Sequence, residues 1–262
     1  MLAQRVAVAA VGVPIIFVLV VIGGWAYALP VAGALAIASA EFQHFKHAWS
    51  SVQVITSAVS VAVVVVLVKA GGGWWAAGYA GALLFIALTA APFRRDPHGE
   101  TALWLSFGGL YVGVLGSAFV LLRDLDNGRD WVLLALLGTF ATDTSAYFVG
   151  RAVGRRKFAP RISPKKTWEG FFGGVAGGLA AVLLANYLLG IRIEPGQAVA
   201  LGIIVPLAAT AGDLFESWIK RSVGVKDASA LIPGHGGALD RLDSVLFVFA
   251  SVWAFAVLVV DV

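Results

Sequence analysis

The sequence predicts an all-α polytopic membrane protein, and three observations support this fold class. Of its 262 residues, 60% are hydrophobic and 13% are charged, whereas a soluble domain is nearer half apolar and a quarter charged. Long apolar segments recur along the chain, each close to the roughly 20 residues that a transmembrane helix needs. Lys and Arg are distributed unevenly between the loops that separate these segments. The composition therefore disfavours an ordinary soluble enzyme and excludes disorder.

Nine apolar segments are predicted to span the membrane, within one integral membrane domain over residues 1–262. They cover residues 6–22, 25–40, 52–68, 74–91, 102–122, 131–150, 171–189, 198–215 and 242–260. Pro30 and Pro206 fall inside predicted spans, where neighbouring groups can satisfy the carbonyls that proline frees. Residues 1–100 carry the N-terminal spans, and residues 101–262 carry the spans with polar motifs.

The first apolar segment has a second interpretation as a signal peptide. Arg5 precedes it, and Ala26-Tyr27-Ala28 could serve as a cleavage site. The apolar run is long for a signal core, however, and eight further spans follow. We therefore favour a first span that is retained.

The distribution of basic residues predicts the orientation. With nine spans, 15 of the 19 Lys and Arg residues lie on the same side as the N-terminus. The other side carries Lys69, Arg123, Arg129 and Arg192. Cytoplasmic loops carry the excess of positive charge. We therefore expect the N-terminus in the cytoplasm and the C-terminus outside, in the plasma membrane (the inner membrane of a bacterium).

Acidic residues are the main candidates for function. Five of them fall within or at the inner ends of predicted spans: Asp143, Asp213, Glu216, Asp240 and Asp243. An ionisable group inside a span is costly unless it is paired or hydrated, and it marks a functional site by default. The alternative is a buried ion pair that holds helices together. We favour function, because all five lie near the same basic side.

The spacing of these acids places them on helix faces. Three polar residues follow Asp213 at helical spacing: Glu216, Ser217 and Lys220 lie three, four and seven residues after it. They therefore share one face if the helix continues.

The absence of cysteine excludes disulfides, thiolate nucleophiles and Cys-ligated metals.

A second helical face has the same arrangement. Asp243 and Ser244 lie three and four residues after Asp240. Carboxylate and hydroxyl oxygens without cysteine suit a hard cation, Mg²⁺ rather than zinc. Such an ion is usually held by one or two carboxylates, with water and phosphate oxygens as the other ligands.

A basic segment precedes the seventh predicted span. Residues 151–166 contain seven Lys or Arg and no acid; Ser163, Lys165 and Lys166 lie at the end of this segment, and Thr167 follows it. Attraction to anionic lipid would explain a scatter of positive charge. Two adjacent lysines with hydroxyls at the entrance of a span favour phosphate binding instead, because lysine and helix N-terminal amides both bind phosphate.

The loop after the eighth predicted span is the most polar stretch. It contains Lys220, Arg221, Lys226, Asp227, His235, Gly236, Gly237 and Arg241. The glycines around His235 allow backbone to lie close to a ligand, although they could equally form simple turns. Spacing alone leaves His235 open as a base, a phosphate donor or a packed loop residue.

Glycines also recur within the spans. Residues 173–178 contain four glycines at small-residue spacing, and Gly109 and Gly113 are four residues apart. We interpret both as sites of close helix packing within the chain rather than as a dimer seam. These residue patterns together predict a cytoplasmic-side patch of carboxylates, bases and glycines, which suits metal-assisted chemistry on phosphates without naming a substrate.

The C-terminal motifs resemble a known family. Residues 217–243 resemble the signature of the phosphatidate cytidylyltransferases, also called CDP-diacylglycerol synthases: Ser217-Trp218-Ile219-Lys220-Arg221, Lys226-Asp227, His235-Gly236-Gly237 and Asp240-Arg241-Leu242-Asp243. Residues 143–151, 163–170 and 212–217 are similar to the same family. Ala238 stands where the family usually has a larger aliphatic residue. Residues 1–100 resemble the family only as apolar spans, with Glu41-Phe42 as a faint trace.

The resemblance implies a reaction and a set of roles. CTP and phosphatidate would give CDP-diacylglycerol and pyrophosphate, with Mg²⁺ as cofactor and room for a second, monovalent cation. Asp213 and Asp240 would be the metal ligands. Asp143, Glu216, Asp243 and His235 would be catalytic or would support the site. Substrate and phosphate binding would fall to Ser163, Lys165, Lys166, Thr167, Ser217, Lys220, Arg221, Lys226, Asp227, Gly236, Gly237 and Arg241.

The same resemblance implies a site on the cytoplasmic side of the lipid bilayer. A homodimer is compatible with it, and no nucleic acid partner is expected. One alternative is another membrane enzyme that uses CTP and a lipid such as an ether lipid or a polyprenol. A transporter or channel is the other alternative, but transport predicts acids spread across the membrane depth, whereas these acids cluster toward one side.

Overall fold

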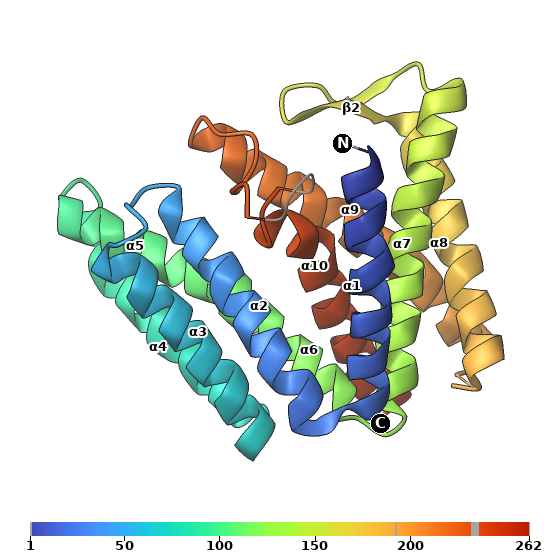
Figure 1. Cartoon of the computed structure of the whole chain (residues 1–262), viewed down its shortest axis with the longest axis horizontal. Helices are drawn as coiled ribbons and strands as arrows, with labels where there is room; N and C mark the ends of the chain where they lie inside the picture. The colour runs from blue at the N-terminus through green and yellow to red at the C-terminus, as the bar shows by residue number, and fades with distance from the viewer. Residues whose placement is uncertain (1, 192, 232–235, 262) are drawn as a thin grey trace. The chain divides into compact units, whose positions relative to one another are not determined.

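The computed structural model describes residues 2–191, 193–231 and 236–261, with side chains from Ala10 onward. Nearly all of its regular structure is helical (Figure 1). The helices are α1 (Leu2–Ile22), α2 (Gly24–His44), α3 (Val52–Gly71), α4 (Trp74–Ala90), η1 (Ala91–Phe93), α5 (Pro97–Gly108), η2 (Gly109–Val114), α6 (Leu115–Arg123), α7 (Gly128–Val153), α8 (Trp168–Leu189), α9 (Pro195–Ser222), α10 (Leu239–Phe255) and η3 (Ala256–Val260). The predicted all-α class is confirmed, with one local exception. The described chain also contains an antiparallel hairpin of β1 (Lys157–Ala159) and β2 (Ser163–Thr167), which the sequence analysis did not predict.

Eight helical stretches of the described chain are long and apolar enough to cross a membrane. They are Gly24–His44, Val52–Gly71, Trp74–Phe93, Pro97–Arg123, Gly128–Val153, Trp168–Leu189, Pro195–Ser222 and Leu239–Val260. Within α1, the stretch Ala10–Ile22 is a shorter apolar helix. Every predicted span therefore lies on a helix, while the count of nine spans and the orientation of the termini stay predictions.

The chain divides into two compact units, and the first is built around an aromatic cluster. This unit consists of Met1–Leu121 and Asp227–Leu242. Phe42 of α2 is fully buried and stacks on Trp104 of α5, with ring centroids 4.6 Å apart. Gly109 and Gly113 lie against Tyr79 of α4: an added Cβ would be 2.9 Å from the Tyr79 hydroxyl at Gly109 and 2.8 Å from the Tyr79 ring at Gly113. These glycines therefore serve close packing within the chain, as predicted.

The second unit holds α7, α8 and α9, and glycines again set the packing distance. It consists of Leu122–Lys226 and Asp243–Val262. A Cβ on Gly174 of α8 would lie 3.0 Å from the Cβ of Ala146 on α7, and a Cβ on Gly178 would lie 2.8 Å from Pro206 of α9. The glycine run 173–178 thus lets α8 pack closely on its neighbours. The prediction of a single domain over residues 1–262 stays a prediction.

Helix boundaries place the polar motifs on regular structure. The Thr167 side chain accepts a hydrogen bond from the Gly170 N–H at 3.2 Å and caps α8. Helix α9 continues to Ser222, so the face predicted for Asp213, Glu216 and Lys220 exists. Helix α10 begins at Leu239, so Asp240 and Asp243 lie on one helix, as their spacing required.

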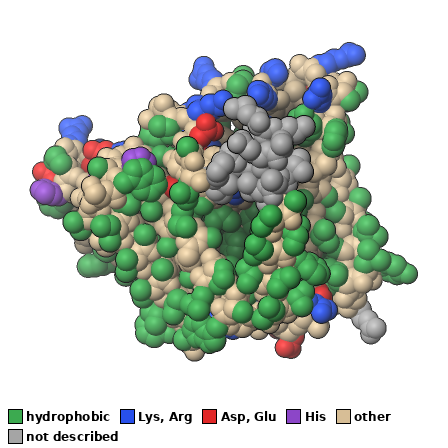
Figure 2. Space-filling model, in the orientation of Figure 1, with side chains coloured by type: hydrophobic (Ala, Val, Ile, Leu, Met, Phe, Trp, Pro, Cys, Tyr) green, Lys and Arg blue, Asp and Glu red, His purple; other side chains and the backbone are tan. Residues whose placement is uncertain are grey.

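The surface is apolar over much of the face seen in Figure 2. Large side chains such as Leu88, Phe85 and Tyr187 are between 68% and 82% exposed. A water-soluble protein rarely exposes so many large apolar side chains. Lys and Arg side chains gather at the hairpin end of the second unit (Figures 1 and 2). Both features fit a helical protein that places its apolar surface in lipid.

Candidate functional site

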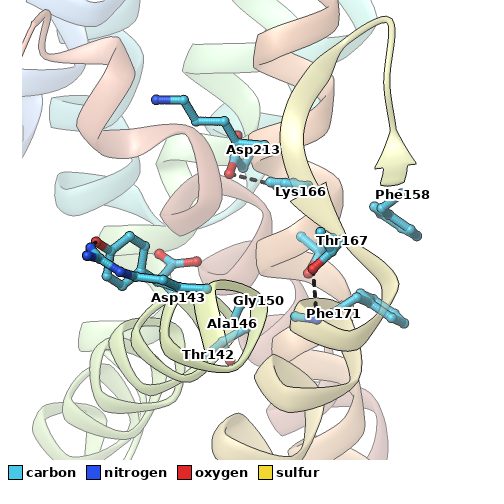
Figure 3. A pocket seen from close by; sticks show the side chains of 14 residues that line it. Thr142, Asp143, Ala146, Gly150, Phe158, Lys166, Thr167, Phe171 and Asp213 are labelled. Carbon is cyan, nitrogen blue, oxygen red and sulfur yellow. Dashed lines mark hydrogen bonds and ion pairs between the residues drawn. The ribbon is translucent and has the colours of Figure 1, made fainter. Parts of the chain in front are cut away.

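A cavity of about 540 Å³ lies in the second unit, among α7, the hairpin, α8 and α9 (Figure 3). Its volume falls in the range of small-molecule binding sites. The lining residues are Thr142, Asp143, Ala146, Tyr147, Gly150, Arg151, Phe158, Lys165, Lys166, Thr167, Gly170, Phe171, Thr210 and Asp213. Five residues predicted from sequence meet here: Asp143, Lys165, Lys166, Thr167 and Asp213.

An ion pair crosses this cavity between β2 and α9. The Lys166 Nζ lies 2.7 Å from Asp213 Oδ2, and the two side chains are 26% and 34% exposed. The other oxygen, Asp213 Oδ1, accepts a hydrogen bond from the Ser217 hydroxyl at 3.3 Å, one helical turn along α9. Figure 3 shows the lysine reaching from the hairpin toward the carboxylate. The pair is partly exposed, so a ligand phosphate could compete for the lysine and a cation for the carboxylate.

The end of α7 supplies the opposite wall of the cavity. Asp143, Tyr147 and Arg151 follow one another at helical spacing and all line it. The Arg151 guanidinium donates a hydrogen bond to the Tyr147 hydroxyl at 2.9 Å. The wall therefore presents one acid and one base about two turns apart on the same helix.

Contacts with α8 fix the start of the hairpin. The N–H groups of Arg155 and Arg156 both donate to the Glu169 carboxylate, at 3.1 to 3.3 Å. Phe158 of β1 stacks on Phe171 of α8, with centroids 5.1 Å apart. Side chains of α8 therefore anchor β1 and the residues before it, which positions the hairpin that carries Lys166 at the cavity.

Other predicted residues on α9 have a different environment. Glu216 is 1% exposed, and Lys220 donates to its carboxylate at 2.7 Å from one turn further on. Neither residue is among those that line the cavity. The Arg221 guanidinium donates to the Val225 carbonyl at 2.9 Å and shapes the chain just after the helix. The buried pair lies within α9, so it is not an ion pair that holds two helices together.

Asp243 belongs to the second unit and lies at a close contact between helices. A Cβ on Gly212 would meet the Asp243 carbonyl and would be 3.0 Å from the Cα of Ser244. This close approach brings residues 243–244 of α10 beside the turn of α9 that carries Asp213. Gly212 lies within residues 212–217, which resemble the family, but only the structure shows its role in helix packing.

Asp240 lies in the first unit, where backbone amides hold it. Its Oδ2 accepts hydrogen bonds from the N–H groups of Gly237 at 2.7 Å and Ala228 at 2.9 Å. Gly236 has a φ of +83°, a conformation that favours glycine. The two glycines therefore form the turn that leads into α10.

The remaining predicted residues are spread over both units. Ser163 pairs with Ala159 in the hairpin, Lys226 and Asp227 follow α9, and Arg241 is in the first turn of α10. His235 lies outside the described residues, so its role stays a prediction. None of these residues lines the cavity in the described part of the chain.

Sequence reasoning missed two groups of residues. Thr142, Phe158, Phe171 and Thr210 line the cavity, but as isolated residues in apolar or basic runs they carry no distinctive spacing, and Tyr147 belongs to the resemblance without an assigned role. Glu41 was only a faint trace in the sequence. The structure places it, fully buried, against the start of α10. Its partners lie 188 to 198 residues away in the sequence, so no local pattern could reveal it.

The oxygen donors suit Mg²⁺. Asp143 and Asp213 present carboxylates to the cavity beside Thr142 and Thr210, and in the first unit Asp240 is a further carboxylate in the first turn of α10. The described residues contain no group of three or more His, Cys, Asp or Glu arranged to hold a metal ion. An ion held by one or two of these carboxylates would complete its shell with water and phosphate oxygens, which is the usual manner for Mg²⁺.

Comparison with known proteins gives consistent matches. The sequence model of the Cytidylyltransferase family matches residues 3–259. A protein of Brucella abortus biovar 1 named phosphatidate cytidylyltransferase is 40% identical over 153 residues, which is 58% of this chain and 56% of the relative. Proteins of the same name from Mycobacterium tuberculosis and Bacillus subtilis are 38% and 35% identical, over 56% and 63% of this chain and 44% and 61% of the relatives.

The matched region spans about half the length of these curated relatives. The family match, by contrast, runs over nearly the whole chain. It includes the hairpin lysines, both ends of α9 and the start of α10, which carry the geometry described above. The chain belongs to the Cytidylyltransferase family.

Proposed function

We propose that this protein transfers the cytidylyl group of CTP to phosphatidate and forms CDP-diacylglycerol and pyrophosphate. The observation that carries the proposal is the cavity at the hairpin end of the second unit, where Lys166 meets Asp213 and where Asp143, Lys165 and Arg151 also face inward. Cations and carboxylates in one cavity fit two phosphate-bearing substrates and a metal ion. The family match and the names of the relatives support the same reaction.

The reaction is a direct displacement at phosphorus. An oxygen of the phosphatidate phosphate attacks the α-phosphorus of CTP, one P–O bond forms, and the bond to the pyrophosphate leaving group breaks. A phosphate monoester is already an oxyanion at neutral pH, so the attack requires no strong base. It requires neutralised charge and in-line positioning, because two anions must approach each other.

The residues of the chain divide these tasks. Lys165 and Lys166 lie on the hairpin over the cavity and would bind phosphate oxygens as point charges. Asp213 and Asp240 would hold Mg²⁺, which when bound neutralises charge on the phosphates. Asp143 would support the site from the α7 wall. Lys220 would act indirectly, since it pairs with Glu216 within α9.

The lipid substrate accounts for a site on apolar helices. The acyl chains of phosphatidate would stay in the bilayer while its headgroup enters the polar cavity. The site would face the cytoplasm, where CTP is present, with the N-terminus on the same side. This orientation follows from the excess of Lys and Arg on one side of the predicted spans.

A transfer assay with the purified full chain tests the proposal. We expect protein in detergent, supplied with labelled CTP, phosphatidate and Mg²⁺, to form CDP-diacylglycerol, and EDTA to stop the reaction. Parallel reactions with a phosphorylated polyprenol and an ether-linked phosphatidate distinguish the lipid substrates. Failure to form a cytidylyl-lipid with phosphatidate, at any lipid concentration, would contradict the proposal.

A further inference from the structure

Glu41 is a buried acid that the proposed reaction does not use directly. It lies near the C-terminal end of α2, and its side chain has no exposed surface. A carboxylate in such surroundings is costly unless hydrogen-bond donors compensate it. Three donors do so: the Ser229 hydroxyl at 2.6 Å, the Ala238 N–H at 3.0 Å and the Leu239 N–H at 2.8 Å.

Two of these donors belong to the N-terminus of α10. The helix begins at Leu239, and the first N–H groups of a helix have no partner within it. They also carry the positive end of the helix dipole, which favours an anion. Glu41 therefore caps α10 from a distant helix, as an N-cap residue would from the adjacent sequence.

The turn before α10 is shaped around this carboxylate. A Cβ on Gly237 would lie 2.6 Å from Glu41 Oε2 and 2.8 Å from its Cδ, so residue 237 must lack a side chain for the approach to occur. Gly236 supplies the positive φ that turns the chain at this point. The two glycines thus have separate physical reasons, one conformational and one steric.

The same turn also holds Asp240. The Gly237 N–H donates to Asp240, while Glu41 lies against the Cα of Gly237. Earlier in the chain, the Ala228 N–H donates to Asp240, and the neighbouring Ser229 hydroxyl donates to Glu41. Two carboxylates therefore bind the same two pieces of chain, residues 228–229 and 237–239.

We propose that Glu41 is a positioning residue, which caps α10 and clamps residues 228–229 to residues 237–239 so that the Asp240 carboxylate keeps a fixed orientation. The inference rests on the proposed function, in which Asp240 is a ligand of Mg²⁺. Glu41 itself is not expected to contact substrate. Its effect passes through residues 228–229 and 237–239, where neighbouring groups donate to Glu41 and to Asp240.

The substitution Glu41→Gln tests the clamp with little change of volume. The amide keeps one acceptor oxygen, and its NH₂ group must then face the N–H of Ala238 or Leu239, where two donors meet. We expect the Mg²⁺ concentration for half-maximal CDP-diacylglycerol formation to rise roughly tenfold to a hundredfold. The KM for phosphatidate should change little. Amide hydrogen exchange at residues 237–239 should become faster.

Two further variants grade the effect. Glu41→Asp keeps both acceptor oxygens and should recover part of the Mg²⁺ affinity that Glu41→Gln loses. Ser229→Ala removes one bond without touching α10 and should shift the Mg²⁺ requirement in the same direction by a smaller factor. If Glu41→Gln is not recovered as folded protein, these two variants carry the same measurement. Gly33→Ala is the matched control on α2, because an added Cβ there meets nothing within 4 Å.

The outcomes separate the clamp from the proposed reaction. An unchanged Mg²⁺ requirement together with unchanged exchange at residues 237–239 in Glu41→Gln would overturn the positioning role, even if kcat fell. A wild-type protein that forms no CDP-diacylglycerol would instead overturn the proposed function. Hydrogen exchange would still decide the clamp in that case, since it needs no turnover.

Discussion

The two metal-ligand candidates, Asp213 and Asp240, are held in opposite ways. Asp213 in the second unit pairs with the flexible side chain of Lys166, and both are partly exposed. Asp240 in the first unit is bound by backbone N–H groups of Gly237 and Ala228, in a turn that a buried Glu41 also holds. A lysine can exchange a carboxylate for a phosphate, whereas a backbone turn cannot move without unfolding locally. Of the two candidates, Asp213 is therefore the adaptable one and Asp240 the rigid one.

Removing either carboxylate should have the largest effect. We expect Asp213→Asn and Asp240→Asn each to lower CDP-diacylglycerol formation by roughly a hundredfold or more, because a neutral amide is a poor Mg²⁺ ligand. Each variant should still insert in the membrane. Turnover close to wild type in both would move the metal site to other residues and remove the basis of the comparison.

Gly237→Ala should break the rigid side of the comparison. Its Cβ would lie 2.6 Å from the Glu41 carboxylate, and overpacking of this kind costs about 1–3 kcal/mol. We expect lower thermal stability and a higher Mg²⁺ requirement, measured in the same preparation. The same substitution at Gly33, which has open space around it, is the control. Equal behaviour of the two variants would show that the turn tolerates movement.

Lys166→Ala should affect the adaptable side without affecting stability. A partly exposed ion pair contributes about 0–1 kcal/mol, so the melting temperature should hardly change. The KM for CTP should rise, since the cavity loses a phosphate-binding cation. Lys157→Ala, on the same hairpin but outside the cavity lining, is the matched control. A KM for CTP that responds equally to both substitutions would favour general surface charge over a specific contact.

Thr167→Ala should give the smallest effect. It removes the cap of α8, which typically contributes about 1 kcal/mol. The hairpin keeps its aromatic and Glu169 contacts, so we expect a modest fall in melting temperature and a small rise in the KM for CTP. A large loss of activity with unchanged stability would instead assign the Thr167 hydroxyl a direct role in substrate binding.

Much of the helical fold could be predicted from sequence because the relevant signals are local. Apolar runs such as that of α3 have the length of a membrane span, and the acids of α9 and α10 have helical spacing. The extension of α9 to Ser222 also has a local cause, because Glu216 and Lys220 pair across one turn.

The missing features depend on contacts between distant residues. The strands β1 and β2 have three and five residues, and β2 contains Pro164, so no alternating pattern marks them. Packing of Phe158 on Phe171 and the binding of Glu169 by backbone amides hold the hairpin in place. Glu41 likewise acquires its role only when α2 and the start of α10 come together. Sequence therefore predicted the charged residues of the cavity better than its aromatic walls or the clamp.

Transfer from CTP labelled at a defined phosphorus tests the central claim most directly. With wild-type protein, phosphatidate and Mg²⁺, label at the α-phosphorus should appear in the lipid, and label at the γ-phosphorus should appear only in pyrophosphate. Asp213→Asn should abolish both signals together. Label from the γ-phosphorus in the lipid, or no labelled lipid from α-labelled CTP, would contradict cytidylyl transfer by this protein.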